Sequence, residues 1–295
     1  MNWLKVGHTT CEDKGTGISV FLFDPAVCGA YHVCGSAPAT VELPAMNLEN
    51  IVKTFNALVL TGGSALGLSA TAGVMRWMNE HKQGLTTPYG LVPIIPAAAI
   101  YDLGVKQPLP PTAEDAYQAC VAATSNNFAS GMIGAGRGAT VGKLVPNTKP
   151  SSGGIGCAKI EIKGGISVLA YAVVNSVGDV RDTSGQIIAG AMDQNNQFSD
   201  TDKYLLSGDF SDTIATSNTC LVTVFIDADL SQIELKRIAK MAVAGMGSCI
   251  SPVFTRYDGD VIFCFANGDK KAPEMVVGTM AAKAVQQAII NAVKR

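Results

Sequence analysis

The stretch Asn218–Ile226, which reads Asn-Thr-Cys-Leu-Val-Thr-Val-Phe-Ile, holds the sharpest boundary in the chain. Before it, residues 190–216 are rich in Asp, Asn, Ser and Thr and contain few apolar side chains, a composition that predicts a long loop. From Leu221 onward, β-branched and aromatic side chains predict a buried strand. The chain therefore passes from a polar loop into a rigid strand at Asn218-Thr219.

Apolar runs and helical patterns alternate on both sides of this strand. We expect strands at 16–23, 57–61, 91–95, 155–162, 166–175 and 261–266, and helices at about 68–82, 112–125, 231–246 and 274–293. Ser231, with Glu234 three residues later, predicts a capping box at the start of one helix. Because strands and helices interleave and no linker separates them, residues 1–295 are expected to form a single α/β domain.

Composition limits the partners of the chain. Hydrophobic residues make up 47% and charged residues 16% of the 295 positions, which favours a homo-oligomer with apolar interfaces. The net charge of −2 and the lack of a basic stripe argue against nucleic acid. No apolar run is long enough to span a bilayer, and residues 1–12 do not resemble a secretory signal. We therefore predict a cytoplasmic protein without a membrane partner.

The cysteines and histidines give no sign of a metal site. Eight cysteines are scattered without a C-x-x-C pair, and only three histidines are present. A zinc site needs such ligands clustered at short spacing. The sequence predicts no metal and no cofactor, and the cysteines are interpreted as reduced thiols of a cytosolic protein.

Common nucleophile and phosphate-binding motifs are also missing. A Ser-His-Asp triad has only three histidines to draw on, at positions 8, 32 and 81. The segment 62–66 lacks the last glycine of a nucleophile elbow, and 136–143 does not have P-loop spacing. We therefore interpret the glycine-rich turn at 62–68 as close packing with backbone donors, and Ser64 is not our candidate nucleophile.

Thr219 is the more informative hydroxyl. A threonine hydroxyl is a weak nucleophile at neutral pH, but the α-amine of the same residue can act as its base. A free α-amine has a pKa of about 8, so part of it is neutral at pH 7. Such an amine exists only if the peptide bond after Asn218 is cut. Taken alone, Asn-Thr is also a common dipeptide at the end of a loop.

Six stretches, in order along the chain, resemble the DmpA family (peptidase family S58). This family includes L-aminopeptidase/D-esterases, β-peptidyl aminopeptidases and 6-aminohexanoate-oligomer (nylon-oligomer) endohydrolases. The matching stretches are 60–68, 92–102, 134–143, 173–179, Asn218-Thr219 and 252–260. The resemblance implies a layered αββα structure of the DmpA/ornithine-acetyltransferase type. It also implies an N-terminal nucleophile hydrolase that cuts itself between Asn218 and Thr219, giving an α-chain of residues 1–218 and a β-chain of residues 219–295.

The nucleophile and the acidic pair indicate one branch of this family. Its nylon-oligomer hydrolases have threonine as the nucleophile and an Asp-x-Asp pair after it, and this chain has Thr219 and Asp258-Gly259-Asp260. Asp258 and Asp260 lie two apart at the entry to a strand and so point the same way. We expect them to orient the amine and hydroxyl of Thr219. Without the resemblance they would read as an ordinary Asp-Gly turn.

Three further residues match family positions. Asn175 ends an apolar strand, and its side-chain amide is a candidate donor to the oxyanion. Lys143 follows the glycine-rich segment 131–142 and is expected to hold a carboxylate or to stabilise the oxyanion. Tyr101 lies in an apolar run, so its hydroxyl is expected to need a partner, and its family position implies a part in self-cleavage or oxyanion binding. Outside the family context, each also fits a structural or surface role.

The resemblance implies a small amide or peptide substrate and a homotetramer of processed chains. The segment 96–100 offers only small apolar side chains, and if it lines the pocket, the pocket suits the methylenes of an ω-amino-acid oligomer. The alternatives are an aminopeptidase/D-esterase, a β-peptidyl aminopeptidase, an acyltransferase of the same fold, or an uncleaved, non-enzymatic binding protein.

Overall fold

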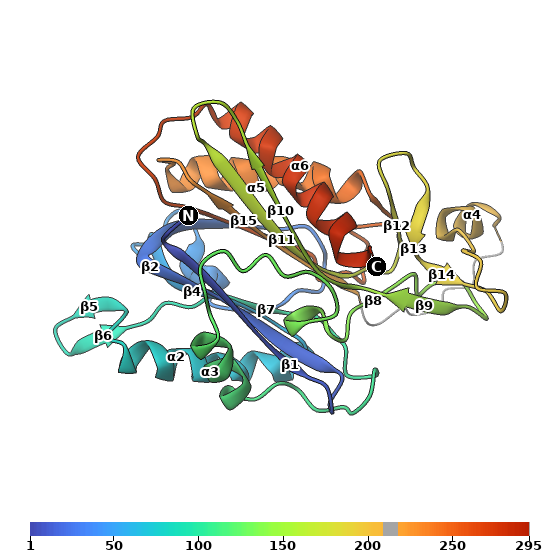
Figure 1. Cartoon of the computed structure of the whole chain (residues 1–295), viewed down its shortest axis with the longest axis horizontal. Helices are drawn as coiled ribbons and strands as arrows, with labels where there is room; N and C mark the ends of the chain where they lie inside the picture. Colours follow the sequence, from blue (N-terminus) through green and yellow to red (C-terminus); the bar gives the residue numbers. More distant parts are fainter. Residues whose placement is uncertain (209–217, 295) are drawn as a thin grey trace.

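Two layers of strands lie between two pairs of helices in the computed structural model, which describes residues 1–208 and 218–294 (Figure 1). The main sheet has the strand order β10-β11-β15-β17-β2-β4-β7-β3, and β1 pairs with β2. These strands are β1 (Leu4–Cys11), β2 (Thr16–Val33), β3 (Ala39–Val41), β4 (Thr54–Thr61), β7 (Ala97–Ala99), β10 (Gly154–Glu161), β11 (Ser167–Asn175), β15 (Thr219–Ile226) and β17 (Val261–Ala266). The predicted layered αββα class is confirmed.

The long strand β2 belongs to both layers. Its pairing with β4 shifts register between Leu22 and Val27, and the intervening Pro25 has no N–H to donate to a ladder. The first part of β2 pairs with β1, and the last part pairs with β17. Because the sheet turns over at this shift, Phe21 packs against Phe225 of β15 with ring centroids 5.3 Å apart. One continuous hydrogen-bonded sheet thus supplies both inner layers.

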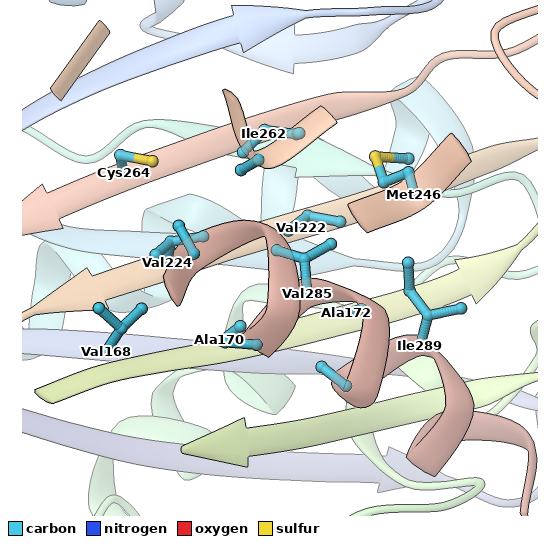
Figure 2. Packing of buried hydrophobic residues seen from close by; sticks show 14 of the residues in the cluster. Val168, Ala170, Ala172, Val222, Val224, Met246, Ile262, Cys264, Val285 and Ile289 are labelled. Atoms are coloured by element: carbon cyan, nitrogen blue, oxygen red, sulfur yellow. The ribbon is translucent and has the colours of Figure 1, made fainter. Parts of the chain in front are cut away.

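The alternation of side chains along β15 divides the core. Leu221 and Phe225 face the other strand layer, whereas Val222 and Val224 pack under helices α5 (Gln232–Gly247) and α6 (Glu274–Val293). Figure 2 shows this second cluster, with α6 crossing the strands. Full burial of each aliphatic side chain contributes roughly 1.5–3 kcal/mol. Helices α2 (Thr71–Glu80) and α3 (Ala113–Val121) cover the outer face of the opposite layer.

The remaining elements are short and lie in the connections. The capping box at the start of α5 is confirmed, with the Ser231 N–H 2.8 Å from Glu234 Oε2. Within the described residues, no helix combines the length and the hydropathy needed to cross a bilayer. The short elements are β5 (Leu85–Thr87), β6 (Gly90–Val92), β8 (Thr140–Val141), β9 (Lys149–Ser152), β12 (Asp179–Arg181), β13 (Ile187–Ala189), β14 (Ala191–Met192), β16 (Ile250–Ser251), α1 (Ser64–Gly67), α4 (Thr201–Leu206), η1 (Leu43–Met46), η2 (Leu68–Ala70) and η3 (Gly134–Gly136).

Two sequence predictions of secondary structure were wrong. Residues 91–95 do not form a strand of the main sheet; the strand is β7, which begins after Pro96. Residues 190–208 are not only loop, because they contain β14 and α4, whose first turn is capped by Asp200 accepting from the Lys203 N–H at 3.2 Å. The rest of the predicted loop, 209–216, lies outside the described residues. Strand β1, near the N-terminus, was not predicted from the sequence.

Candidate active site

Strand register brings the predicted site residues to one end of the sheet. Thr219, the first residue of β15, lies opposite Asn175, the last residue of the antiparallel strand β11. On its other side, β15 runs parallel to β17, and Asn218 forms a bridge with Asp258 just before β17 begins. One strand end and two strand starts therefore meet at Thr219.

Thr219 is held against its own preceding peptide bond. It is only 6% exposed, and it lies on the same face of β15 as Leu221 and Phe225, between the two strand layers. Its Oγ donates a hydrogen bond to the carbonyl oxygen of Asn218. The same oxygen accepts from the N–H of Gly259 at 3.1 Å. The hydroxyl and a backbone donor thus converge on one carbonyl group.

The acidic pair supports the backbone around Thr219. Asp260 Oδ1 accepts from the N–H of Cys220 at 2.6 Å, one residue after the nucleophile candidate. Asp258 Oδ2 accepts from the N–H of Thr255 at 2.6 Å. Both carboxylates are buried at the edge where Thr219 lies. In the uncut chain the Thr219 nitrogen is part of a peptide bond, so the predicted orientation of a Thr219 amine by these carboxylates remains a prediction.

Asn175, which is buried, and Lys143, which is half-buried, form a pair beside this edge. Asn175 Oδ1 accepts from Lys143 Nζ at 2.8 Å and from the Thr140 N–H at 3.0 Å. These two donors fix which side of the amide is the oxygen, so Nδ2 is the side that donates. Nδ2 contacts the carbonyl oxygen of Tyr101 at 3.3 Å, near the long limit for a hydrogen bond.

Burial shifts the pKa values of two ionisable groups of the site to about 7. Burial lowers the pKa of Lys143 to about 7, against the attraction of nearby carboxylates. Burial, and then the neighbouring Asp258, raises the pKa of Asp260 to about 7. Burial also raises the pKa of Asp258. Ionisable groups whose pKa values are shifted by burial and by neighbouring charges are common in active sites.

Tyr101 stands at the rim of a pocket beside Lys143. The pocket has a volume of about 430 Å³, and its lining includes Tyr101, Asp102, Val105, Lys143, Val145 and Pro150. Tyr101 is 42% exposed and not buried, so burial alone does not require its hydroxyl to have a protein partner, and its part in self-cleavage or oxyanion binding remains a prediction. The apolar segment 96–100 is also not among the lining residues, because Ala97–Ala99 is buried between β4 and β3.

Asp102 is a site residue that sequence reasoning missed. Its Oδ2 accepts from Thr16 Oγ at 2.6 Å, and its Oδ1 accepts from the Gly63 N–H at 2.7 Å. Burial raises the pKa of Asp102. It anchors the segment that carries the Tyr101 carbonyl and one wall of the pocket. Its one sequence signal was a carboxylate at the end of an apolar run.

The described residues hold no group of three or more His, Cys, Asp or Glu side chains placed for a metal ion. The chemistry that this arrangement offers is a hydroxyl nucleophile, buried carboxylates, a lysine and an amide donor. These are the parts of an acyl-transfer site, in which a nucleophile attacks a carbonyl and donors stabilise the oxyanion.

The fold is similar to that of an L-aminopeptidase D-Ala-esterase/amidase from Ochrobactrum anthropi, whose structure was described as a variant of the N-terminal nucleophile hydrolase fold. The TM-score is 0.74 at 18% identity, over 99% of this chain and 84% of that one. A β-aminopeptidase from a Burkholderia species gives a TM-score of 0.72 at 20% identity, over 98% of this chain and 83% of that one.

The chain belongs to peptidase family S58, whose family model matches residues 2–295, and it is a hydrolase of that family. It is 36% identical to an uncharacterized aminopeptidase of Mycobacterium leprae, over 87% of this chain and 72% of the relative. It is 26% identical to a 6-aminohexanoate-oligomer endohydrolase of a Kocuria species, over 92% of this chain and 74% of that enzyme. The predicted family is confirmed.

Proposed function

We propose that this hydrolase cuts itself between Asn218 and Thr219 and then uses Thr219 as an N-terminal nucleophile on amides. The observation that carries the proposal is the position of Thr219 Oγ against the Asn218 carbonyl in a buried site. Cleavage would release the Thr219 α-amine, which lies on the same residue as the hydroxyl and can take its proton. The reaction then passes through an acyl-threonine ester that water hydrolyses.

The neighbouring groups have complementary roles in this proposal. Asn175 Nδ2 donates to the oxyanion that forms when Thr219 attacks a substrate carbonyl. Lys143 holds the other side of the Asn175 amide and so fixes its direction. The carboxylates of Asp258 and Asp260 orient the new α-amine, which becomes a cation when it takes the hydroxyl proton.

Intact mass spectrometry of two Thr219 variants tests the self-cleavage. The natural chain should give a fragment that begins at Thr219. Thr219→Val keeps the branched shape in this buried position but has no hydroxyl, so it should remain one chain and hydrolyse no amide. Thr219→Ser keeps a hydroxyl and should still be cut, which serves as the matched control. A natural chain that stays intact while fully active would rule the proposal out.

For the substrate, we propose linear amides with an apolar acyl part, of which 6-aminohexanoate oligomers are the best example. Apolar side chains such as Val105, Val145 and Pro150 contribute to the pocket beside Lys143. Each buried methylene is worth roughly 0.8 kcal/mol, so five contribute about 4 kcal/mol before binding losses. The second candidate is an aminopeptidase, which the name of the 36% identical mycobacterial relative favours.

The two candidates differ in their need for a free amine. An aminopeptidase must pair the substrate ammonium with a carboxylate, because an unpaired buried charge is costly. We would offer a linear 6-aminohexanoate oligomer acetylated at its amino end, beside the unblocked oligomer, a dipeptide amide and a β-peptide. Cleavage of the acetylated oligomer is the expected result. Hydrolysis that occurs only with a free α- or β-amine would assign the enzyme to the aminopeptidases.

A further inference from the structure

We infer that the backbone N–H of Gly259 is the oxyanion donor for self-cleavage. This inference rests on the proposed self-cleavage and assigns the group that stabilises its transition state. The Gly259 nitrogen lies 3.1 Å from the carbonyl oxygen of Asn218, and Thr219 Oγ donates to that same oxygen. The oxygen that would become negative when Thr219 attacks is therefore already bound by a fixed donor.

The register of the sheet explains why the donor is there. The parallel pairing of β15 with β17 extends backward through the bridge between Asn218 and Asp258, which aims the next N–H at the Asn218 carbonyl. The segment that carries the donor is fixed from the other side by β2 and the residues after it. The Cys34 N–H donates to the Asp260 carbonyl at 2.8 Å, and the Ala37 N–H donates to the Asp258 carbonyl at 2.9 Å. A donor held on both sides needs little reorganisation during the reaction.

The absence of a side chain at position 259 also follows from this geometry. A Cβ there would lie 2.8 Å from Thr219 Oγ and 2.7 Å from the carbonyl oxygen of Ala37. Both distances are shorter than such a carbon tolerates. Glycine thus lets the backbone approach the scissile peptide bond and leaves room for the nucleophile.

The bond changes balance with this donor in place. Thr219 Oγ forms a bond to the Asn218 carbonyl carbon, and the π electrons move to the carbonyl oxygen, which faces the Gly259 N–H. When the carbonyl re-forms, the bond to the Thr219 nitrogen breaks, and the hydroxyl proton ends on that nitrogen. Water then adds to the resulting ester and releases the Asn218 carboxylate and the Thr219 hydroxyl. The same oxygen carries the negative charge in both additions.

An amide-to-ester exchange in the full chain tests this donor. Incorporating glycolic acid at position 259 by nonsense suppression replaces the N–H by an ester oxygen and adds no side chain. The matched control is glycolic acid at position 164, in the turn between β10 and β11, where even an added Cβ would contact nothing within 4 Å. Mass spectrometry measures how the amount of the fragment that begins at Thr219 grows with time. Circular dichroism and a thermal melt show whether each chain is folded.

We expect the ester at 259 to slow the appearance of this fragment by about 100-fold or more, as the loss of one oxyanion donor does in other acyl-transfer enzymes. The ester at 164 should mature at the rate of the natural chain. If the folded 259 ester matures as fast as the 164 ester, the inference is overturned while self-cleavage stands. If the natural chain is itself never cut, self-cleavage fails and this inference falls with it. Should the 259 ester not fold, hydrogen exchange followed by NMR in the uncut Thr219→Val chain must show the Gly259 amide proton protected by its bond to the Asn218 carbonyl; exchange of that proton at the rate of an exposed amide would also overturn the inference.

Discussion

His8 on strand β1 is a half-buried imidazole, far in sequence from the proposed catalytic residues. Its Nδ1 lies 2.8 Å from Ser19 Oγ, and that oxygen accepts a hydrogen bond from the Ala135 N–H at 3.0 Å. The Ser19 hydroxyl can therefore donate its own proton to Nδ1 of a neutral His8 ring. Burial lowers the pKa of His8 from 6.5 to about 4, because a charged ring there would lose its water.

This shift makes stability fall in acid. Between pH 6.5 and about 4 the unfolded chain binds a proton at His8 that the folded chain does not, so stability rises with pH across this window. As the pH falls through it, His8 should remove up to about 3 kcal/mol from the free energy of unfolding. Urea denaturation of the natural chain and of His8→Gln, measured across this window, isolates the contribution of the ring. If the free energy of unfolding changed equally with pH in the two chains, this account would be contradicted.

At the scale of elements, the connection after β7 carries the pocket wall, and Asp102 anchors it. Asp102→Ala should leave the Thr16 hydroxyl and the Gly63 N–H without their acceptor, at a cost of roughly 1–3 kcal/mol for each buried group. The Tyr101 carbonyl that meets the Asn175 amide should then shift. We expect a lower melting temperature and slower hydrolysis.

Asp102→Asn is the matched control for this prediction. Its side-chain oxygen can still accept from the Gly63 N–H, and its NH₂ can donate to Thr16 Oγ, so both contacts survive in altered form. Differential scanning fluorimetry and amide hydrolysis should rank the natural chain first, Asp102→Asn second and Asp102→Ala last. Hydrolysis by the folded alanine variant at the natural rate would show that the anchor does not affect the site.

Elements with a strong local signal were predictable from the sequence, and those with contacts distant in sequence were not. Helix α6 occupies the predicted residues 274–293, and β15 follows the predicted apolar run, because each has a periodicity or composition of its own. Strand β7 is three alanines after a proline, and only its pairing with β3 and β4 makes it a strand. The Asp102 anchor depends on Thr16, which is 86 positions away along the chain.

The site residues could be proposed from the sequence, whereas their contacts, which join distant parts of the chain, could not. Thr219, Asn175, Asp258 and Asp260 were chosen on the family resemblance, and the strand register then places them together. Their contacts could not be derived from the sequence, because hydrogen bonds such as that from Cys220 to Asp260 depend on how β15 and β17 align. The pocket is lined by residues that follow Ile100 and not by the segment 96–100, because β7 is buried between β3 and β4.

At the scale of the whole molecule, the hairpin of β5 and β6 projects from the four layers (Figure 1). Tyr89 at its turn is 100% exposed, and Leu85 and Val92 on its strands are also exposed. The hairpin segment 84–93 contains no charged residue. A two-stranded hairpin is marginally stable on its own in water, so this one gains stability if it packs against another surface. We propose that it packs against a second copy of this chain within a homotetramer.

Light scattering tests this assembly. The natural protein at micromolar concentration should have the mass of four chains, whether or not each chain is cut. Tyr89→Asp places a charge where an apolar contact is proposed, and burying that charge without a partner is costly, so the tetramer should dissociate into smaller species. Ile51→Asp is the matched control, because Ile51 is 95% exposed but lies on the connection before β4 and not on the hairpin. It should leave the mass unchanged. A natural protein that is monomeric would refute the oligomer, and a tetramer that survives Tyr89→Asp would place the interface away from the hairpin.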